Sequence, residues 1–240
     1  MNRYRDKKTG EERLWFDDGE IESIIEDELV KANLCPTLNS PVVNVERFVE
    51  SYLDTQFDPY AALPDDVIGQ TIFRIGERPI VMINADLTGA ALDDDNSPLG
   101  LQGRWRATVA HEGSHVLLHT CLFIVNPSQK SLFKVEHEQD PMHVYRCMKR
   151  EVSFVRAASD WKEIQANKGM AALLMPKSIF FDACRLEFER LGVERIDRHT
   201  IMADELASRM AKMFQVSRQA ASIRLDTLSI LSHQGQKKIF

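Results

Sequence analysis

The 240-residue sequence predicts an α+β fold, and three observations support this class. Apolar residues recur at helical spacing through most of the chain, and two short runs rich in β-branched residues interrupt them. One helical stretch contains the sequence His-Glu-Gly-Ser-His, and the end of the chain shows a helix, turn and helix pattern. With 44% hydrophobic residues, the chain can bury one core of ordinary size and carry a small helical appendage.

The N-terminal half is expected to combine helices with a small sheet. Residues 1–19 carry dense mixed charge and few apolar side chains, which predicts a flexible tail. The elements expected next are helices over residues 21–32, capped by Asp17 and Asp18, and over residues 44–53, followed by neighbouring strands over residues 67–73 and 80–83. The acidic run at residues 93–98 lacks the spacing of a calcium loop, so we expect a solvated loop there.

The His-Glu-x-x-His motif lies in a helix that is apolar over most of its circumference. His111 and His115 are four residues apart, so two imidazole nitrogens can take adjacent positions around a Zn²⁺ ion. Glu112 lies beside that position, where it could accept a proton from a water molecule as a general base. Histidines and a glutamate in a buried helix need partners, which favours a metal site over a solvated amphipathic helix.

The third metal ligand is expected on the helix over residues 160–176, where Glu163 and Asn167 share the inward side with apolar residues. A catalytic zinc site takes three protein ligands, so Glu163 is the candidate. In the alternative interpretation Asp160 and Glu163 form a capping box, and the glutamate only closes the helix end. His119 is a rival ligand, but a continuous helix spreads the three histidines over about 12 Å, too far for one ion.

The segment between these two helices shows weaker patterns. Short strands are expected over residues 121–125 and 131–135, with an irregular stretch over residues 137–158. His137 begins a second His-Glu pair, but Pro141 prevents the helix that would bring two histidines onto one face. Within this stretch, His143 and Tyr145 are left as candidates for the group that stabilises an oxyanion.

The C-terminal region is expected to be helical. A helix over residues 179–191 ends at Gly192, a helix-turn-helix pattern occupies residues 203–231, and residues 234–240 are expected to be disordered. DNA-reading motifs usually place Gly at the turn position held here by Gln215, and their second helix is basic and exposed. This second helix offers only Arg218 and Arg224 against Asp226. We therefore expect the region to pack on the core or to recognise protein, and DNA binding is not expected.

Composition and charge exclude several other classes. The net charge of −6 gives no overall attraction to nucleic acid. The cysteines form no Cys-x-x-Cys pair, which is typical of reduced, mostly buried thiols; they are Cys35, Cys121, Cys147 and Cys184. No apolar run approaches the roughly 18 residues of a membrane span, and the polar N-terminus lacks a signal peptide's apolar segment. A cytoplasmic protein without membrane contact is therefore expected.

Together the two motif-bearing helices resemble the ImmA/IrrE family of metallo-endopeptidases. Members of that family carry an H-E-x-x-H-x-x-L-H helix followed by an E-x-x-A-N-x-x-A-A-x-L-L-M-P segment. Residues 111–119 match the first pattern and residues 163–176 match the second. The departures are Gly169, where an aromatic residue is common, and Met170, where Ala is expected.

The resemblance implies a zincin-like core of the gluzincin type with a helical C-terminal appendage. The implied zinc ligands are His111, His115 and Glu163, and the implied catalytic base is Glu112. The expected division is a tail at residues 1–19, a peptidase core at residues 20–192 and a helix-turn-helix-like region at residues 193–240.

What the resemblance implies for function is selective cleavage of another protein, since family members cleave helix-turn-helix transcriptional repressors. Two alternatives stay open. One is a regulator whose metal site is structural and whose tail binds DNA. The other is an interaction protein, such as a component of a toxin-antitoxin pair, that acts by binding without proteolysis.

Overall fold

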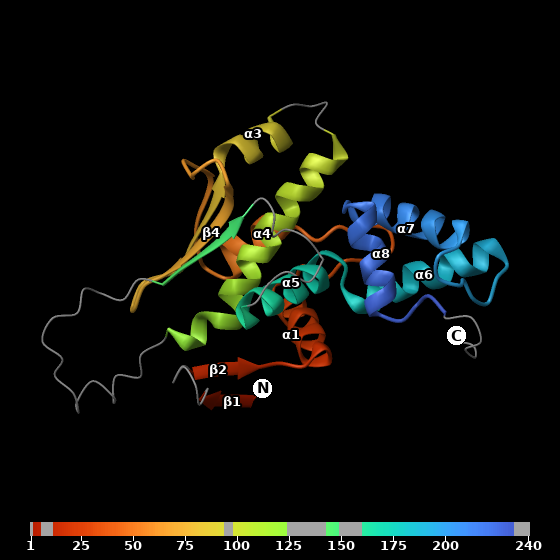
Figure 1. Cartoon of the computed structure of the whole chain (residues 1–240), viewed down its shortest axis with the longest axis horizontal. Coiled ribbons are helices and arrows are strands. Elements are labelled where there is room, and N and C mark those ends of the chain that lie inside the picture. Colours follow the sequence, from red (N-terminus) through yellow and green to blue (C-terminus); the bar gives the residue numbers. More distant parts are fainter. Residues whose placement is uncertain (1, 6–11, 94–97, 124–142, 149–159, 233–240) are drawn as a thin grey trace, which may run out of the picture.

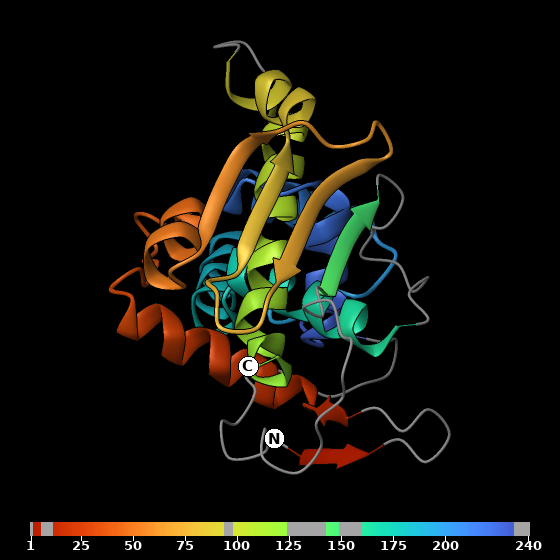
Figure 2. The same cartoon turned by 90° about the vertical axis from the view of Figure 1, so that its left-hand side faces the viewer.

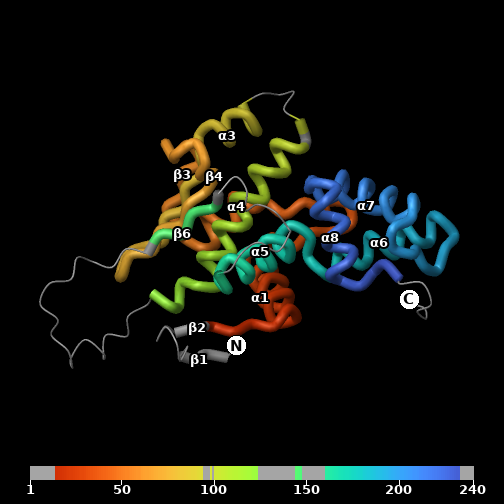
Figure 3. The backbone as a smooth tube through the Cα atoms, in the orientation of Figure 1, coloured from red at the N-terminus to blue at the C-terminus, as the bar shows by residue number. Residues whose placement is uncertain are grey.

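The computed structural model describes residues 2–5, 12–93, 98–123, 143–148 and 160–232, and within them the fold is α+β (Figure 1). A small mixed sheet forms one side of the molecule, and the long helix α4 (Leu99–His119) crosses the sheet on its inner face. Helix α5 (Trp161–Leu174) packs against α4, and the C-terminal helices lie on the far side of α5 from the sheet (Figure 3). The candidate site lies between α4, α5 and the sheet.

The remaining elements follow one another along the chain. The strands are β1 (Asn2–Arg5), β2 (Glu12–Trp15), β3 (Gln56–Ala61), β4 (Val67–Phe73), β5 (Ile80–Asn84) and β6 (His143–Met148). The other helices are α1 (Asp18–Lys31), α2 (Val45–Arg47), α3 (Ala85–Leu92), α6 (Lys177–Leu191), α7 (Ile201–Phe214) and α8 (Arg218–Thr227). A π-helical turn, Phe48–Tyr52, extends α2, and a 3₁₀ turn, Thr120–Leu122, follows α4.

The larger sheet has the order β3-β5-β4-β6, in which β3 runs parallel to β5 and the other neighbours are antiparallel (Figure 2). The two predicted strands are confirmed as neighbours, β4 and β5. The two edge strands, β3 and β6, were not predicted, and β6 corrects the irregular stretch expected over residues 137–158. An edge strand needs only its neighbour's backbone to form, so its sequence carries a weak apolar signal.

Most of the predicted helices are confirmed, with Asp17 and Glu20 forming a capping box at the start of α1. Helix α3 was not predicted. The strand expected over residues 121–125 is wrong for its described part, residues 121–123, because the chain continues from α4 into a 3₁₀ turn. Residues 131–135, His137 and residues 234–240 lie outside the described residues, as does most of the loop expected at residues 93–98.

The expectation of a flexible tail over residues 1–19 is wrong for the described residues 2–5 and 12–19. Strand β2 pairs with β1, and the side chain of Leu14 is 1% exposed in the core. Phe16 is also buried, and α1 already begins at Asp18. The apolar residues 14–16 cannot form a core alone, but Leu14 and Phe16 join one that α1 and α5 provide, while Trp15 is 55% exposed.

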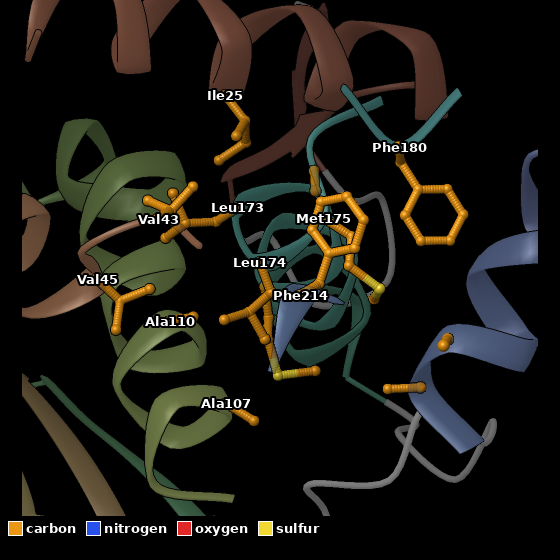
Figure 4. Packing of buried hydrophobic residues seen from close by; sticks show 14 of the residues in the cluster. Ile25, Val43, Val45, Ala107, Ala110, Leu173, Leu174, Met175, Phe180 and Phe214 are labelled. Carbon is orange, nitrogen blue, oxygen red and sulfur yellow. The ribbon is translucent and has the colours of Figure 1, made fainter. Parts of the chain in front are cut away.

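The C-terminal helices pack on this same core. Figure 4 shows Ile25 of α1, Ala110 of α4 and Leu173 of α5 among its side chains, together with Phe214 of α7. Helix α8 is anchored through Arg224, which is 3% exposed and reaches across to α1 and α5. Among the described residues, no helix combines the length and the apolar character that a membrane crossing requires.

Candidate metal centre

Helix α4 carries three buried polar side chains, of which two face α5 and the third, Glu112, faces strand β4. His111, Glu112 and His115 are each 0–1% exposed, and the two imidazole rings lie with their centroids 4.8 Å apart. One helical turn separates the histidines, so their rings project in the same direction. The helix thus places an imidazole nitrogen of His111 next to one of His115, as the motif predicts.

Helix α5 brings the carboxylate of Glu163 against both rings. The Nε2 atom of His111 lies 3.2 Å from Oε2 of Glu163, and Nε2 of His115 lies 3.2 Å from Oε1. The two Nε2 atoms are themselves 3.2 Å apart. Donor atoms around a tetrahedral zinc ion with bonds of about 2.0 Å lie about 3.3 Å from one another. The three side chains therefore form a group that could hold a metal ion.

The capping-box interpretation of Glu163 is wrong. Asp160 does cap α5, accepting a hydrogen bond from the backbone of Lys162 at 3.0 Å, but the Glu163 carboxylate turns toward the histidines. In α1, by contrast, both halves of a capping box are present. Although burial acts to raise it, the two imidazole rings, each 3.2 Å from a carboxylate oxygen, hold the pKa of Glu163 well below its usual range.

The outer nitrogens of both histidines also have partners. The Nδ1 atom of His111 lies 3.2 Å from Oδ1 of Asn167, the amide that the helical pattern places on the inward side. The Nδ1 atom of His115 lies 3.2 Å from Nδ1 of His119, and Nε2 of His119 lies 3.1 Å from Oε1 of Gln165. Burial, and then the neighbouring His115, lower the pKa of His119 to about 3, so this ring is neutral. His119 thus contacts the ring nitrogen of His115 that points away from Glu163. The contact of Gln165 with His119 was not predicted.

Glu112 is held from the sheet. The Thr71 hydroxyl of β4 donates a hydrogen bond to Oε2 of Glu112 at 2.5 Å, while Oε1 is buried and has no hydrogen-bond partner among the described residues. Burial raises the pKa of the carboxyl to about 7. Gly69 makes room for it, because a Cβ there would lie 2.6 Å from Oε1. Neither strand residue was predicted, since no local pattern in the sequence links Thr71 or Gly69 to the motif.

Strand β6 closes the site from the other side. The Tyr145 ring stacks on His115, with centroids 5.0 Å apart and planes 15° from parallel, so this candidate lies beside a metal-binding side chain. Cys147 is buried, and its sulfur, with His111 and Glu112, forms a second group of donors within 4.8 Å of one another. The side chain of His143 is outside the described residues, although its backbone pairs with Phe73.

The departure at Gly169 has a structural reason. A Cβ at this position would lie 2.7 Å from Oγ and 2.8 Å from Cβ of Ser114 on α4, so the two helices touch too closely for any side chain. This contact sets the distance between Glu163 and the two histidines. The space that an aromatic residue would need does not exist between these helices.

We therefore expect Gly169→Ala to destabilise the fold by about 1–2 kcal/mol in urea denaturation, because overpacking costs about 1–3 kcal/mol and outweighs the gain of less than about 1 kcal/mol from replacing a helical glycine. Gly100→Ala is the matched control, since a Cβ at this α4 position meets nothing within 4 Å. Equal stabilisation by both substitutions would show that the two helices are not in tight contact at Gly169.

The groups that could hold a metal ion thus come from α4, α5 and β6, three elements that are distant in sequence. The structure brings together His111 and His115, the two ligands that the motif predicts. Glu163 is the third member of their group, and each imidazole nitrogen lies 3.2 Å from one of its oxygens. Compared with models of known protein families and with curated protein sequences, the chain matches none of them.

Proposed function

We propose that the protein is a zinc-dependent endopeptidase, with His111, His115 and Glu163 as the zinc ligands and Glu112 as the general base. The proposal is carried by one observation. Two imidazole nitrogens lie 3.2 Å from each other and each 3.2 Å from one oxygen of the Glu163 carboxylate, and beside them lies the buried carboxylate of Glu112, whose Oε1 has no hydrogen-bond partner among the described residues. Two imidazoles and one carboxylate are a ligand set typical of catalytic zinc, which leaves a fourth position open.

Zinc held there would supply a Lewis acid that polarises a peptide carbonyl and acidifies a water molecule. The remaining chemistry belongs to the protein. Because Thr71 engages Oε2 of Glu112, the carboxylate presents Oε1 as its proton acceptor. A carboxyl whose pKa burial raises toward neutrality can take a proton from water and return it to the amine that leaves.

We further propose that the substrate is a regulatory protein, most specifically a helix-turn-helix transcriptional repressor. Support comes from the resemblance of residues 111–119 and 163–176 to the ImmA/IrrE motifs. The test is coexpression of the chain with candidate repressors, comparing wild type with Glu112→Gln and identifying fragments by mass spectrometry. Zinc-loaded wild type that leaves every candidate repressor intact would favour a partner-binding role without proteolysis.

Selectivity is a separate prediction. The donor side chains on α4 are almost fully buried and Tyr145 of β6 covers one of them, so a flexible chain has restricted access to the site. We expect zinc-loaded protein to leave casein intact during an incubation in which it cleaves its own substrate, as followed by gel electrophoresis. Rapid, general digestion of casein would show that access is open and would contradict this prediction.

The structure argues against the DNA-binding alternative, because one of the two arginines of α8 is buried. Arg224 is buried against α1 and α5, and Arg218, which is 67% exposed, is the only other arginine of α8. Few phosphates can then be neutralised, so we expect no duplex binding tighter than about 10⁻⁶ M near physiological salt. Fluorescence anisotropy on mixed duplexes measures this. Submicromolar binding that Arg218→Ala weakens would promote the DNA-binding regulator.

A further inference from the structure

We propose that Gln165 and His119 are positioning residues, which fix the proton of His115 on Nδ1 and so keep its Nε2 lone pair available to a metal ion. They form a one-directional chain of hydrogen bonds that starts at a backbone carbonyl of β2 and ends at His115. The inference rests on the proposed function only in taking Nε2 of His115 as a metal ligand.

The direction of this series of hydrogen bonds is set by the contact between the Leu14 carbonyl and Gln165. The Leu14 carbonyl can only accept a hydrogen bond, and Nε2 of Gln165 donates to it at 2.8 Å. The opposite orientation of the Gln165 amide would place two oxygens against each other at this distance. The contact therefore assigns the amide, and Oε1 of Gln165 must be the atom that faces His119.

The donor and acceptor atoms of His119 and His115 follow in turn from the orientation of the Gln165 amide. Oε1 of Gln165 can only accept, so the Nε2 atom of His119, 3.1 Å away, carries the proton of that neutral ring. The Nδ1 atom of His119 is then an acceptor, and the atom 3.2 Å from it, Nδ1 of His115, must be the donor. The lone pair of His115 consequently sits on Nε2, and because an oxygen of Glu163 lies 3.2 Å away, this arrangement needs the positive charge of a metal ion between the two atoms.

Burial makes the assignment strict. Gln165, His119 and His115 are all buried, so a wrongly oriented member would leave a donor or acceptor unsatisfied away from water. The partner of Gln165 lies 151 residues away along the chain. The N-terminal hairpin, by placing the Leu14 carbonyl, thereby contributes to the metal site without touching it.

Nuclear magnetic resonance tests the proton positions directly. Long-range ¹H–¹⁵N correlation spectra of the zinc-loaded wild type should show His119 protonated on Nε2 alone and His115 protonated on Nδ1. In zinc-loaded Gln165→Met, which keeps the volume but removes the amide, the His119 ring should show mixed tautomers. Zinc competition titrations should give an affinity about 10–100-fold weaker, the usual loss when a residue that orients a metal ligand is removed.

Two substitutions of His119 separate its hydrogen bond from its bulk. His119→Asn keeps an acceptor close to the position of Nδ1, whereas His119→Leu keeps only volume, so the Asn variant should bind zinc more tightly than the Leu variant. Ser114→Ala is the control, because this buried hydroxyl donates only within α4, to the Ala110 carbonyl at 2.7 Å. Its zinc affinity should match wild type.

A His119 proton on Nδ1 in the spectra of zinc-loaded wild type would overturn the proposal, and this measurement depends on no variant folding. A folded Gln165→Met protein with wild-type zinc affinity and fixed tautomers would overturn it as well. Failure of the proposed function looks different. Zinc-loaded wild type without any proteolysis would refute the peptidase while leaving the tautomers and affinities as expected.

Discussion

Glu112→Gln is expected to bind zinc as tightly as wild type and to cleave its substrate at least about 10²-fold more slowly, the low end of the contribution of a general base. The amide oxygen can still accept the hydrogen bond of Thr71, so the side chain should stay in place. The buried position of Oε1 is then taken by an NH₂ group, which cannot accept a proton. Single-turnover cleavage assays and metal analysis of the same samples measure both properties.

Glu163→Ala provides the contrast, since it removes one of the three donors and should lose most of the bound zinc. Loss of zinc also removes the stabilisation that a bound ligand gives, so its thermal unfolding should no longer respond to a chelator. Full zinc occupancy in Glu163→Ala would refute the ligand assignment. Cleavage by zinc-loaded Glu112→Gln at the wild-type rate would refute the assignment of the base.

Arg224→Met is expected to destabilise the fold by about 3 kcal/mol, within the range measured when one partner of a buried ion pair is removed. The guanidinium bridges three elements: its Nη2 donates to Glu22 of α1 and to the Met175 carbonyl after α5, both at 2.7 Å, and Nη1 donates to Glu22 as well. Methionine fills much of the space but leaves the carboxylate and the carbonyl without their donors. Urea denaturation followed by circular dichroism gives the free energy of unfolding.

Arg218→Ala is the matched control on the same helix. Its guanidinium lies 3.7 Å from Asp204 with both side chains exposed, a kind of pair that contributes less than about 1 kcal/mol. Unchanged stability in Arg224→Met would show that α8 is not anchored to α1 through this arginine. A double substitution of both arginines is a poor probe of DNA binding, because it would disturb the fold through Arg224.

The sequence by itself determined the features that depend on short-range periodicity. Helical geometry places residues four apart on one face, so the pairing of His111 with His115 followed from spacing alone. The same periodicity predicted α1, α5 and α7, and β-branched runs predicted β4 and β5. The residues of these elements repeat at the spacing of the structure they form, so the pattern can be read before the partners are known, although packing supplies most of the stability.

Only the tertiary structure decided which distant residues meet at the site and which charges are buried. Glu163 could equally have capped its own helix until the packing of α5 on α4 turned it toward the histidines. Thr71 reaches Glu112 from 41 residues away, and Arg224 reaches Glu22 from 202 residues away. Such partners leave no local trace, because a hydrogen bond constrains two atoms in space and says nothing about the residues between them. The edge strand β6 and the hairpin that ends at Leu14 are decided in the same way, since each needs a partner that another part of the chain supplies.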